Sequence, residues 1–133
     1  MSVFVDASAL YAMLVRTEED HEKVVEAFSG LLKEGRRLVS TNYVLVETCA
    51  LLQHRFGLPA VRDLEERIVP LLQVRWIDES LHRRAVERLF STDRRDVSLV
   101  DCASFVVMEA EGLQEALALD QDFEGQGYRM IPS

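Results

Sequence analysis

The sequence predicts an α/β fold in which a central, mostly parallel β-sheet carries helices on both faces. Short β-branched or aromatic runs alternate along the chain with longer helical segments, and this order is typical of a parallel sheet. The chain has 133 residues, 48% of them hydrophobic, which is enough for one compact core. We therefore expect residues 1–133 to form a single domain.

The N-terminal segment begins with a strand and continues into two helices. Val3 to Val5 is a short apolar run of the strand type, and the small residues from Ala7 onward begin a helix. Thr17 and Asp20 have the spacing of a capping box, and the apolar residues after them recur at helical intervals. Gly35 ends this second helix.

A second strand and two more helices follow. Residues 38–40 are a strand candidate, and Thr41 or Asn42 is suited to cap the helix that reaches about Phe56. Gly57 then ends that helix. Proline is common in the first turn of a helix, so Pro59 predicts a fourth helix.

The C-terminal half repeats the alternation. Residues 74–77 form a strand candidate, and Asp78 is suited to cap the helix behind it. Ser98 begins an apolar helix that Gly112 ends. Two further strands are expected, over residues 116–119 and, at the edge of the sheet, residues 128–131.

Composition excludes several classes of protein. A formal charge of −8 argues against holding nucleic acid by bulk electrostatics, which requires lysine or arginine at the phosphates. Cys49 and Cys102 lie in apolar helical segments and do not form a disulfide framework. No apolar run approaches the roughly 20 residues of a membrane helix, and no secretory signal is visible. We expect a cytoplasmic protein that does not contact a membrane.

Four carboxylates have positions that composition alone does not explain. Asp6 and Asp120 each follow an apolar strand, and the carboxyl ends of parallel strands are where ligands collect. Glu47 projects from an apolar helix face, and Asp101 lies in the first turn of a helix that starts at the same edge. Four acids in one cleft repel one another unless a cation neutralises them, and all-oxygen ligation favours Mg²⁺ or Mn²⁺.

Each acid also has a plainer interpretation. Asp6 and Asp120 are suited to cap a helix or turn, and Ser98 with Asp101 has the spacing of a capping box. Glu47 would serve as half of a buried ion pair. The convergence of all four in one cleft is the hypothesis that the structure has to decide.

Four segments carry a resemblance to a known family. They are Phe4 to Leu10, Thr41 to Glu47, Leu99 to Ala103 and Leu119 to Phe123. In this order they resemble the PIN-domain nucleases, most closely the VapC toxins of toxin-antitoxin pairs. The resemblance implies a PIN-like three-layer sandwich. It covers nearly the whole chain, although Ala118 stands where the family often has a small hydroxyl residue.

The resemblance also implies an activity and a set of ligands. It implies a ribonuclease in which Asp6, Glu47, Asp101 and Asp120 hold Mg²⁺, or alternatively Mn²⁺, for in-line hydrolysis of RNA. Asp122 is a candidate further ligand. Three hydroxyl residues would orient the acids or contact phosphate: Ser8, Thr41 and Ser98. The implied partners are the RNA substrate, a small antitoxin protein and, as a homodimer, a second copy of the chain.

The net negative charge opposes binding of RNA, but arginines would form a basic rim around the cleft and contact the phosphates. Arg94 and Arg95 are the strongest candidate RNA contacts, since they lie just before Ser98 and Asp101. The further candidates are Arg36, Arg37, Arg83, Arg84 and Arg88.

Other classes fit the residues less well. A phospho-acceptor receiver domain needs a late lysine, but Lys23 and Lys33 are the only lysines and both lie in an early helix. A haloacid-dehalogenase-like phosphatase needs an aspartate two residues after Asp6, and Ser8 stands there. The alternative that remains open is a catalytically silent PIN-like binding or scaffold module.

Overall fold

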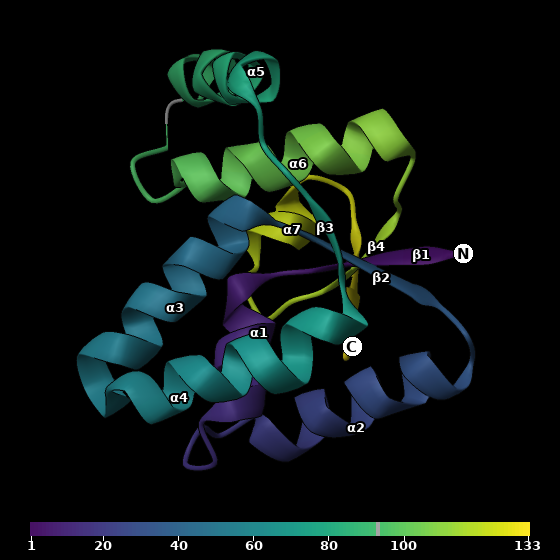
Figure 1. Ribbon diagram of the computed structural model, residues 1–133. Helices are drawn as coiled ribbons and strands as arrows, with labels where there is room; N and C mark the ends of the chain where they lie inside the picture. Colours follow the sequence, from purple (N-terminus) through teal and green to yellow (C-terminus); the bar gives the residue numbers. More distant parts are fainter. Residues whose placement is uncertain (93) are drawn as a thin grey trace.

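A five-stranded sheet forms the centre of the computed structural model, which describes residues 1–92 and 94–133 (Figure 1). The strands are β1 (Ser2–Val5), β2 (Arg37–Thr41), β3 (Gln73–Arg75), β4 (Glu115–Leu117) and β5 (Arg129–Ile131). Their order across the sheet is β3-β2-β1-β4-β5, and every neighbouring pair is parallel. The prediction of a mostly parallel sheet is confirmed.

The helices cover both faces of this sheet, as the sequence predicted. They are α1 (Ala7–Leu14), α2 (His21–Lys33), α3 (Asn42–Phe56), α4 (Leu58–Asp63), α5 (Glu79–Ser91), α6 (Leu99–Glu111) and α7 (Asp122–Gly125). Crossovers between parallel strands are right-handed, so the direction of travel decides which face a connecting helix covers. The chain moves one way through β1, β2 and β3 and then returns to β4 and β5. Figure 1 accordingly shows α2 and α4 on one side of the sheet and α5 and α6 on the other.

The strand order reverses between β1 and β4, which are neighbours in the sheet although far apart in sequence. Beyond the carboxyl ends of these two strands the chain departs toward opposite faces, and ligands collect in the crevice left at such a point. Asp6 directly follows β1, and Asp120 lies three residues after the end of β4. The topology therefore brings both acids to one crevice.

The core explains why the most apolar helix lies where it does. Every residue from Asp101 to Met108 in α6 is buried, because α6 packs between the sheet and α5. Val3, Phe4 and Val5 of the central strand β1 are fully buried as well. Phe123 of α7 completes this core, with its ring centroid 5.0 Å from that of Phe105.

Most helix ends lie where the capping residues predicted them. Thr41 caps α3 through a hydrogen bond from Val44 N to its Oγ1 (3.1 Å), and Asp78 caps α5 in the same way. Gly57 and Gly112 end α3 and α6 with φ angles of 82° and 68°, a left-handed backbone that glycine adopts without strain.

Three local predictions were wrong or incomplete. Thr17 and Asp20 do not form a capping box, because the chain between α1 and α2 makes successive turns and α2 begins only at His21. Helix α4 continues into a π-helical segment (Leu64–Ile68) and a 3₁₀ turn (Val69–Leu71). Pro70 accounts for this change, since its ring clashes with an α-helical carbonyl four residues earlier. The short helix α7 was not predicted.

The cysteines and the hydropathy of the helices agree with the sequence analysis. Cys49 and Cys102 are both free thiols, and Cys102 is buried. Among the described residues, no helix combines the length and the apolar character that crossing a bilayer requires.

Candidate metal centre

The four predicted acids converge in one cleft of about 520 Å³. Asp6, Glu47, Asp101 and Asp120 all line it, and they come from the end of β1, from α3, from the first turn of α6 and from the loop after β4. The cleft lies where the strand order reverses. The four acids therefore lie together in one cleft and do not serve only as separate caps or ion-pair partners.

Asp6 is the most deeply placed of the four. Its Oδ2 accepts hydrogen bonds from Ser8 N (3.2 Å) and Ser8 Oγ (2.6 Å), which makes Asp6 the N-cap of α1. Its Oδ1 is buried and has no hydrogen-bond partner among the described residues. Burial raises the pKa of Asp6, and the hydrogen bonds from Ser8 oppose that rise.

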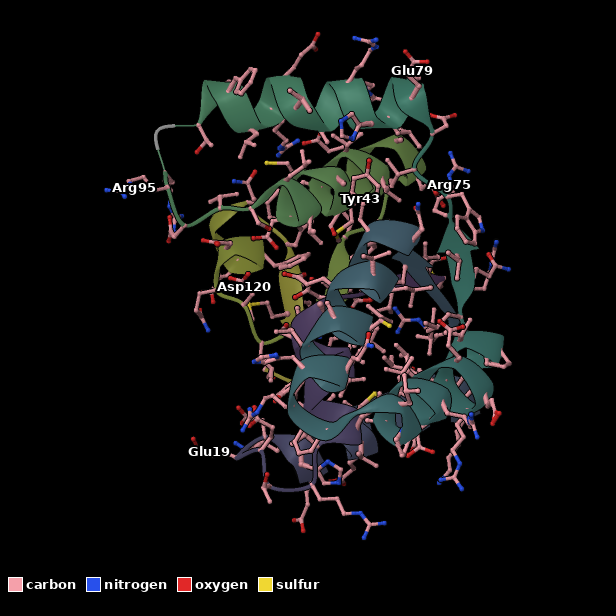
Figure 2. All side chains as sticks on the ribbon, turned by 60° about the vertical axis from the view of Figure 1, so that its left-hand side comes forward. Glu19, Tyr43, Arg75, Glu79, Arg95 and Asp120 are labelled. Atoms are coloured by element: carbon pink, nitrogen blue, oxygen red, sulfur yellow. The ribbon has the colours of Figure 1, made fainter. Side chains whose placement is uncertain are left out.

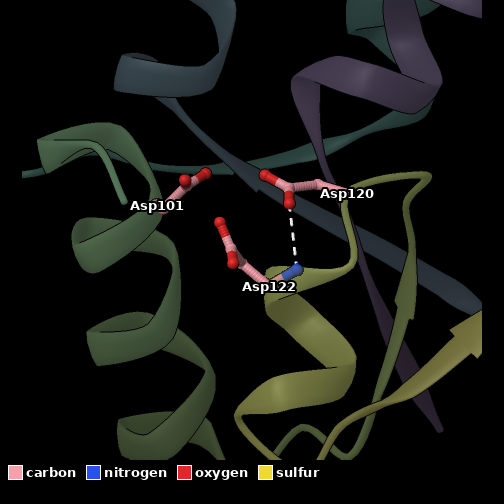
Figure 3. A group of neighbouring side chains, drawn as sticks. All are labelled: Asp101, Asp120 and Asp122. Carbon is pink, nitrogen blue, oxygen red and sulfur yellow. Dashed lines mark hydrogen bonds between the residues drawn. The ribbon is translucent and has the colours of Figure 1, made fainter. Parts of the chain in front are cut away.

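Asp101 is both a helix cap and a cleft acid. Ser98 Oγ accepts from Asp101 N (3.0 Å) while Asp101 Oδ2 accepts from Ser98 N (3.3 Å), so the predicted capping box is present. Figure 3 shows the same carboxylate pointing toward those of Asp120 and Asp122. Burial, followed by the charges of Asp6 and Asp120, raises the pKa of Asp101 to about 7.

Asp120 and Asp122 form a close group with Asp101. One carboxylate oxygen from each of the three lies within 4.8 Å of the others. Asp120 Oδ1 also accepts from Asp122 N (2.9 Å), which holds the two side chains side by side (Figure 3). Burial, followed by the charge of Asp120, raises the pKa of Asp122, whereas Arg94 lowers it.

Glu47 faces this group from α3. Its side chain is half-buried, and burial followed by the charges of Asp6 and Asp120 raises its pKa. Because the charges of Asp6 and Asp120 both raise its pKa, Glu47 interacts electrostatically with both aspartates. The suggestion of a buried ion pair for Glu47 is not supported, because the ion pairs among the described residues do not include it.

This donor set fits a hard divalent cation. All of the candidate ligand atoms are carboxylate oxygens, which Mg²⁺ and Mn²⁺ prefer and which are poor ligands for softer metals. The buried and unpartnered Oδ1 of Asp6 is costly without a positive group close by. Asp101, Asp120 and Asp122 have oxygens close enough together to share such an ion, and Asp6 and Glu47 line the adjoining cleft.

The three predicted hydroxyl residues divide between two roles. Ser8 and Ser98 line the cleft and hydrogen-bond Asp6 and Asp101 respectively. Ser8 Oγ also accepts from Leu119 N (3.0 Å), so it ties the ends of β1 and β4 together. Thr41 is fully buried as the cap of α3 and lies outside the set of residues that line the cleft.

The predicted arginines also divide. Arg94 Nη2 lies 2.7 Å from Asp122 Oδ1, so Arg94 contacts the acidic group next to the cleft. Arg95 is exposed, and Figure 2 shows its side chain extending away from the body of the molecule. Arg37 is the first residue of β2 and Arg36 precedes it, so both lie at the amino ends of the strands, away from the cleft. The prediction that they belong to a basic rim around the cleft was wrong.

The sequence analysis did not predict six of the residues that line the cleft: Ala7, Tyr11, Glu18, Leu51, Asp96 and Leu119. Tyr11 and Leu51 had a usable signal, because they follow Ser8 and Glu47 by three and four residues on the same helix faces. Glu18 and Asp96 lie in connecting segments, where no periodicity indicates which way a side chain points.

The fold and the cleft define a class: parallel α/β proteins with a carboxylate cleft at the point where the strand order reverses. Comparison with known families agrees, because residues 3–126 match the family model described as PIN domain. The chain belongs to the PIN-domain family. The recognition made from the sequence is confirmed.

Relatives and solved structures extend this result. The chain is 37% identical over 92 residues to the "23S rRNA-specific endonuclease VapC20" of Mycobacterium tuberculosis, and the match covers 68% of the chain and 70% of that protein. The crystal structure of the same VapC20, described as a "Sarcin-Ricin loop cleaving toxin", superimposes with a TM-score of 0.83 and 30% identity over 95% of both chains. FitAcB from Neisseria gonorrhoeae shares the fold, with a TM-score of 0.68, 14% identity and coverage of 98% and 96%.

Proposed function

We propose that the chain is a metal-dependent endoribonuclease that hydrolyses RNA phosphodiester bonds. One observation carries this proposal: Asp6, Glu47, Asp101 and Asp120 converge in one cleft, where an oxygen of Asp6 is buried without a partner. Such an arrangement does not stabilise the fold by itself, because like charges in a low-dielectric cleft repel one another. It suits a protein that binds a cation there. The likeness to the VapC20 endonuclease supports the same activity.

The metal ligands that we propose are Asp6, Glu47, Asp101 and Asp120, with Asp122 as a further one. We propose Mg²⁺ as the ion and Mn²⁺ as the alternative. When bound, a divalent ion of this kind supplies Lewis-acid catalysis of water attack and stabilises charge on the phosphate.

The neighbouring residues of the chain prepare the ligands. Ser8 fixes Oδ2 of Asp6 and leaves Oδ1 without a hydrogen-bond partner among the described residues. The capping box with Ser98 fixes Asp101 in the same manner. Because the ligands are held before an ion arrives, less ordering entropy is lost on binding. Arg94 and Arg95 remain our candidates for contact with the RNA backbone.

A partner protein follows from the same proposal. A ribonuclease related to a toxin that cleaves a ribosomal loop would damage the cell that makes it unless it is restrained. We therefore propose that the chain is the toxin of a toxin-antitoxin pair, neutralised by a small antitoxin. Its homodimeric state and its cytoplasmic location stay predictions from the sequence.

The test is cleavage of RNA by purified protein with Mg²⁺, with Mn²⁺ and with chelator. The substrates are a mixed cellular RNA pool and a short RNA containing the sarcin-ricin loop, chosen because VapC20 is described as cleaving it. Asp6→Asn and Asp101→Asn are compared with Asp63→Asn, an exposed aspartate of α4. We expect cleavage that needs metal, is lost at least about 100-fold in the first two variants and persists in the third.

Binding of Mn²⁺, measured by calorimetry on the same proteins, separates the remaining explanations. Mn²⁺ binding without cleavage would direct attention to a narrower RNA target. If the wild type binds no Mn²⁺ at all, the metal centre is refuted and the silent binding or scaffold module becomes the preferred function.

A further inference from the structure

Arg94 connects the solvent-exposed segment before α6 to the buried part of the acidic cluster. Its Nη2 lies 2.7 Å from Asp122 Oδ1 and 2.7 Å from Asp96 Oδ2, and its Nε lies 3.2 Å from Asp96 Oδ1. The side chain of Arg94 is 52% exposed, but that of Asp122 is only 10% exposed. The guanidinium therefore reaches inward from the surface onto a buried carboxylate.

The carboxylate that Arg94 contacts belongs to the metal-binding set. Asp122 contributes, with Asp101 and Asp120, to the three oxygens that lie within 4.8 Å of one another. A guanidinium and a divalent cation carry the same sign of charge, so both cannot approach Asp122 closely without mutual repulsion. Of the two acceptors of Arg94, Asp96 is exposed and Asp122 is buried.

Other surface ion pairs of the molecule differ from this arrangement. Arg83 pairs with Glu79 one helical turn away, and both side chains are more than 70% exposed. Such pairs contribute little and point to no ligand. Arg94 instead sits against a cluster whose remaining carboxylates have like charge, in the position that a cation would take.

Resting on the proposed metal centre, we propose that Arg94 is an internal counter-ion that holds Asp122 in the metal-free protein and competes with the divalent cation for it. Asp96 anchors the guanidinium at this place through its two hydrogen bonds. A cation that uses Asp122 as a ligand has to displace Arg94 first. Arg94 thus lowers the affinity of Asp101, Asp120 and Asp122 for the cation.

The test is a titration with Mn²⁺ alone, without RNA, followed by electron paramagnetic resonance or calorimetry. We compare the wild type with Arg94→Gln and with Arg95→Gln, a matched removal of the adjacent arginine, which points away from the cleft (Figure 2). Mn²⁺ binding should tighten about tenfold in Arg94→Gln and stay unchanged in Arg95→Gln. In an Asp122→Asn background the Arg94 substitution should have no effect, because the two residues act on each other.

The outcomes separate this inference from the proposed function. If Asp6→Asn loses Mn²⁺ binding but Arg94→Gln binds Mn²⁺ like the wild type or more weakly, the metal centre stands and the competition by Arg94 is refuted. If neither the wild type nor Arg94→Gln binds Mn²⁺, both proposals fail together. Near-ultraviolet circular dichroism confirms that each variant is folded.

Discussion

The charged residues at the amino ends of the parallel strands are arranged differently from those at the carboxyl ends. We call the first set the paired edge and the second the acidic edge. At the amino ends of the strands, Arg36 contacts Glu115, and Arg129 Nε lies 3.7 Å from the other oxygen of the same carboxylate. At the carboxyl ends, several carboxylates face one another, and Arg94 is the cation that the described residues place against them. The first arrangement pairs opposite charges and stabilises the fold, whereas the second keeps like charges close together at the proposed cation site.

The largest stability loss should come from the paired edge. Glu115→Gln removes the carboxylate that Arg36 Nη2 contacts, and the side chain of Arg36 is only 17% exposed. We expect the free energy of unfolding in denaturant to fall by about 2–3 kcal/mol, because the largely buried guanidinium keeps, among the described residues, only its longer, 3.6 Å contact with the exposed Glu34. Glu79→Gln, in an exposed pair, is the control and should cost less than about 0.5 kcal/mol. Equal effects would mean that the paired edge has no special role in stability.

The next effect concerns how the acidic edge is held in place. Ser8→Ala removes the hydroxyl that donates to Asp6 and accepts from Leu119 N. Mn²⁺ affinity, measured by calorimetry, should fall about tenfold or more, since groups that orient metal ligands typically have effects of this size. Ser104→Ala is the control, because the hydrogen bond that the described residues give the buried Ser104 hydroxyl is to Val100 O in its own helix. Unchanged affinity in Ser8→Ala would show that Asp6 needs no such support.

A substitution in the acidic cluster should have the opposite sign on stability. Asp101→Asn removes one negative charge but keeps an oxygen that can cap α6. The metal-free protein should become more stable by about 1–2 kcal/mol, which raises Tm by about 3–8 °C for a chain of this size. Differential scanning calorimetry in chelator measures this change. A destabilised variant would show that the carboxylates at this edge do not strain the fold.

The smallest effect is a dependence on pH. The pKa of Asp101 is about 7, above its ordinary value of 3.8, so the folded protein keeps a proton that the unfolded chain releases. Stability from this proton is complete below about pH 4 and is lost as pH rises through 7. Without metal, unfolding free energy should fall by about 1 kcal/mol between pH 6 and 8, a figure that includes solvent screening. Mn²⁺ affinity should rise over the same range, and Asp101→Asn should remove both trends.

Local sequence signals predicted most of the helices and strands. Capping residues such as Thr41, Asp78 and Ser98 act on the backbone three residues away, so their effect is written in the nearby sequence. The four acids could be assigned to one edge for a similar reason, because strand ends and first helical turns are local features. The capping box at Thr17 failed because the same spacing also occurs within turns.

Contacts between distant segments were beyond reach of this reasoning. Arg36 and Glu115 are 79 residues apart, and the sequence around one of them does not indicate that it pairs with the other. The pairing of Arg94 with Asp122 likewise depends on how the segment before α6 folds back over α7. Sequence could identify Arg94 as a residue near the cleft, but its partner is a property of the tertiary structure.

The two uses of each acid have a consequence for how this protein evolves. Asp6 and Asp101 give one oxygen to a helix end and turn the carboxylate toward the cleft. Replacement by alanine would remove a proposed metal ligand together with the N-cap of α1 or one half of the capping box of α6, so it would cost stability as well as activity. A descendant that loses cleavage but keeps the fold should therefore carry asparagine or serine at these positions.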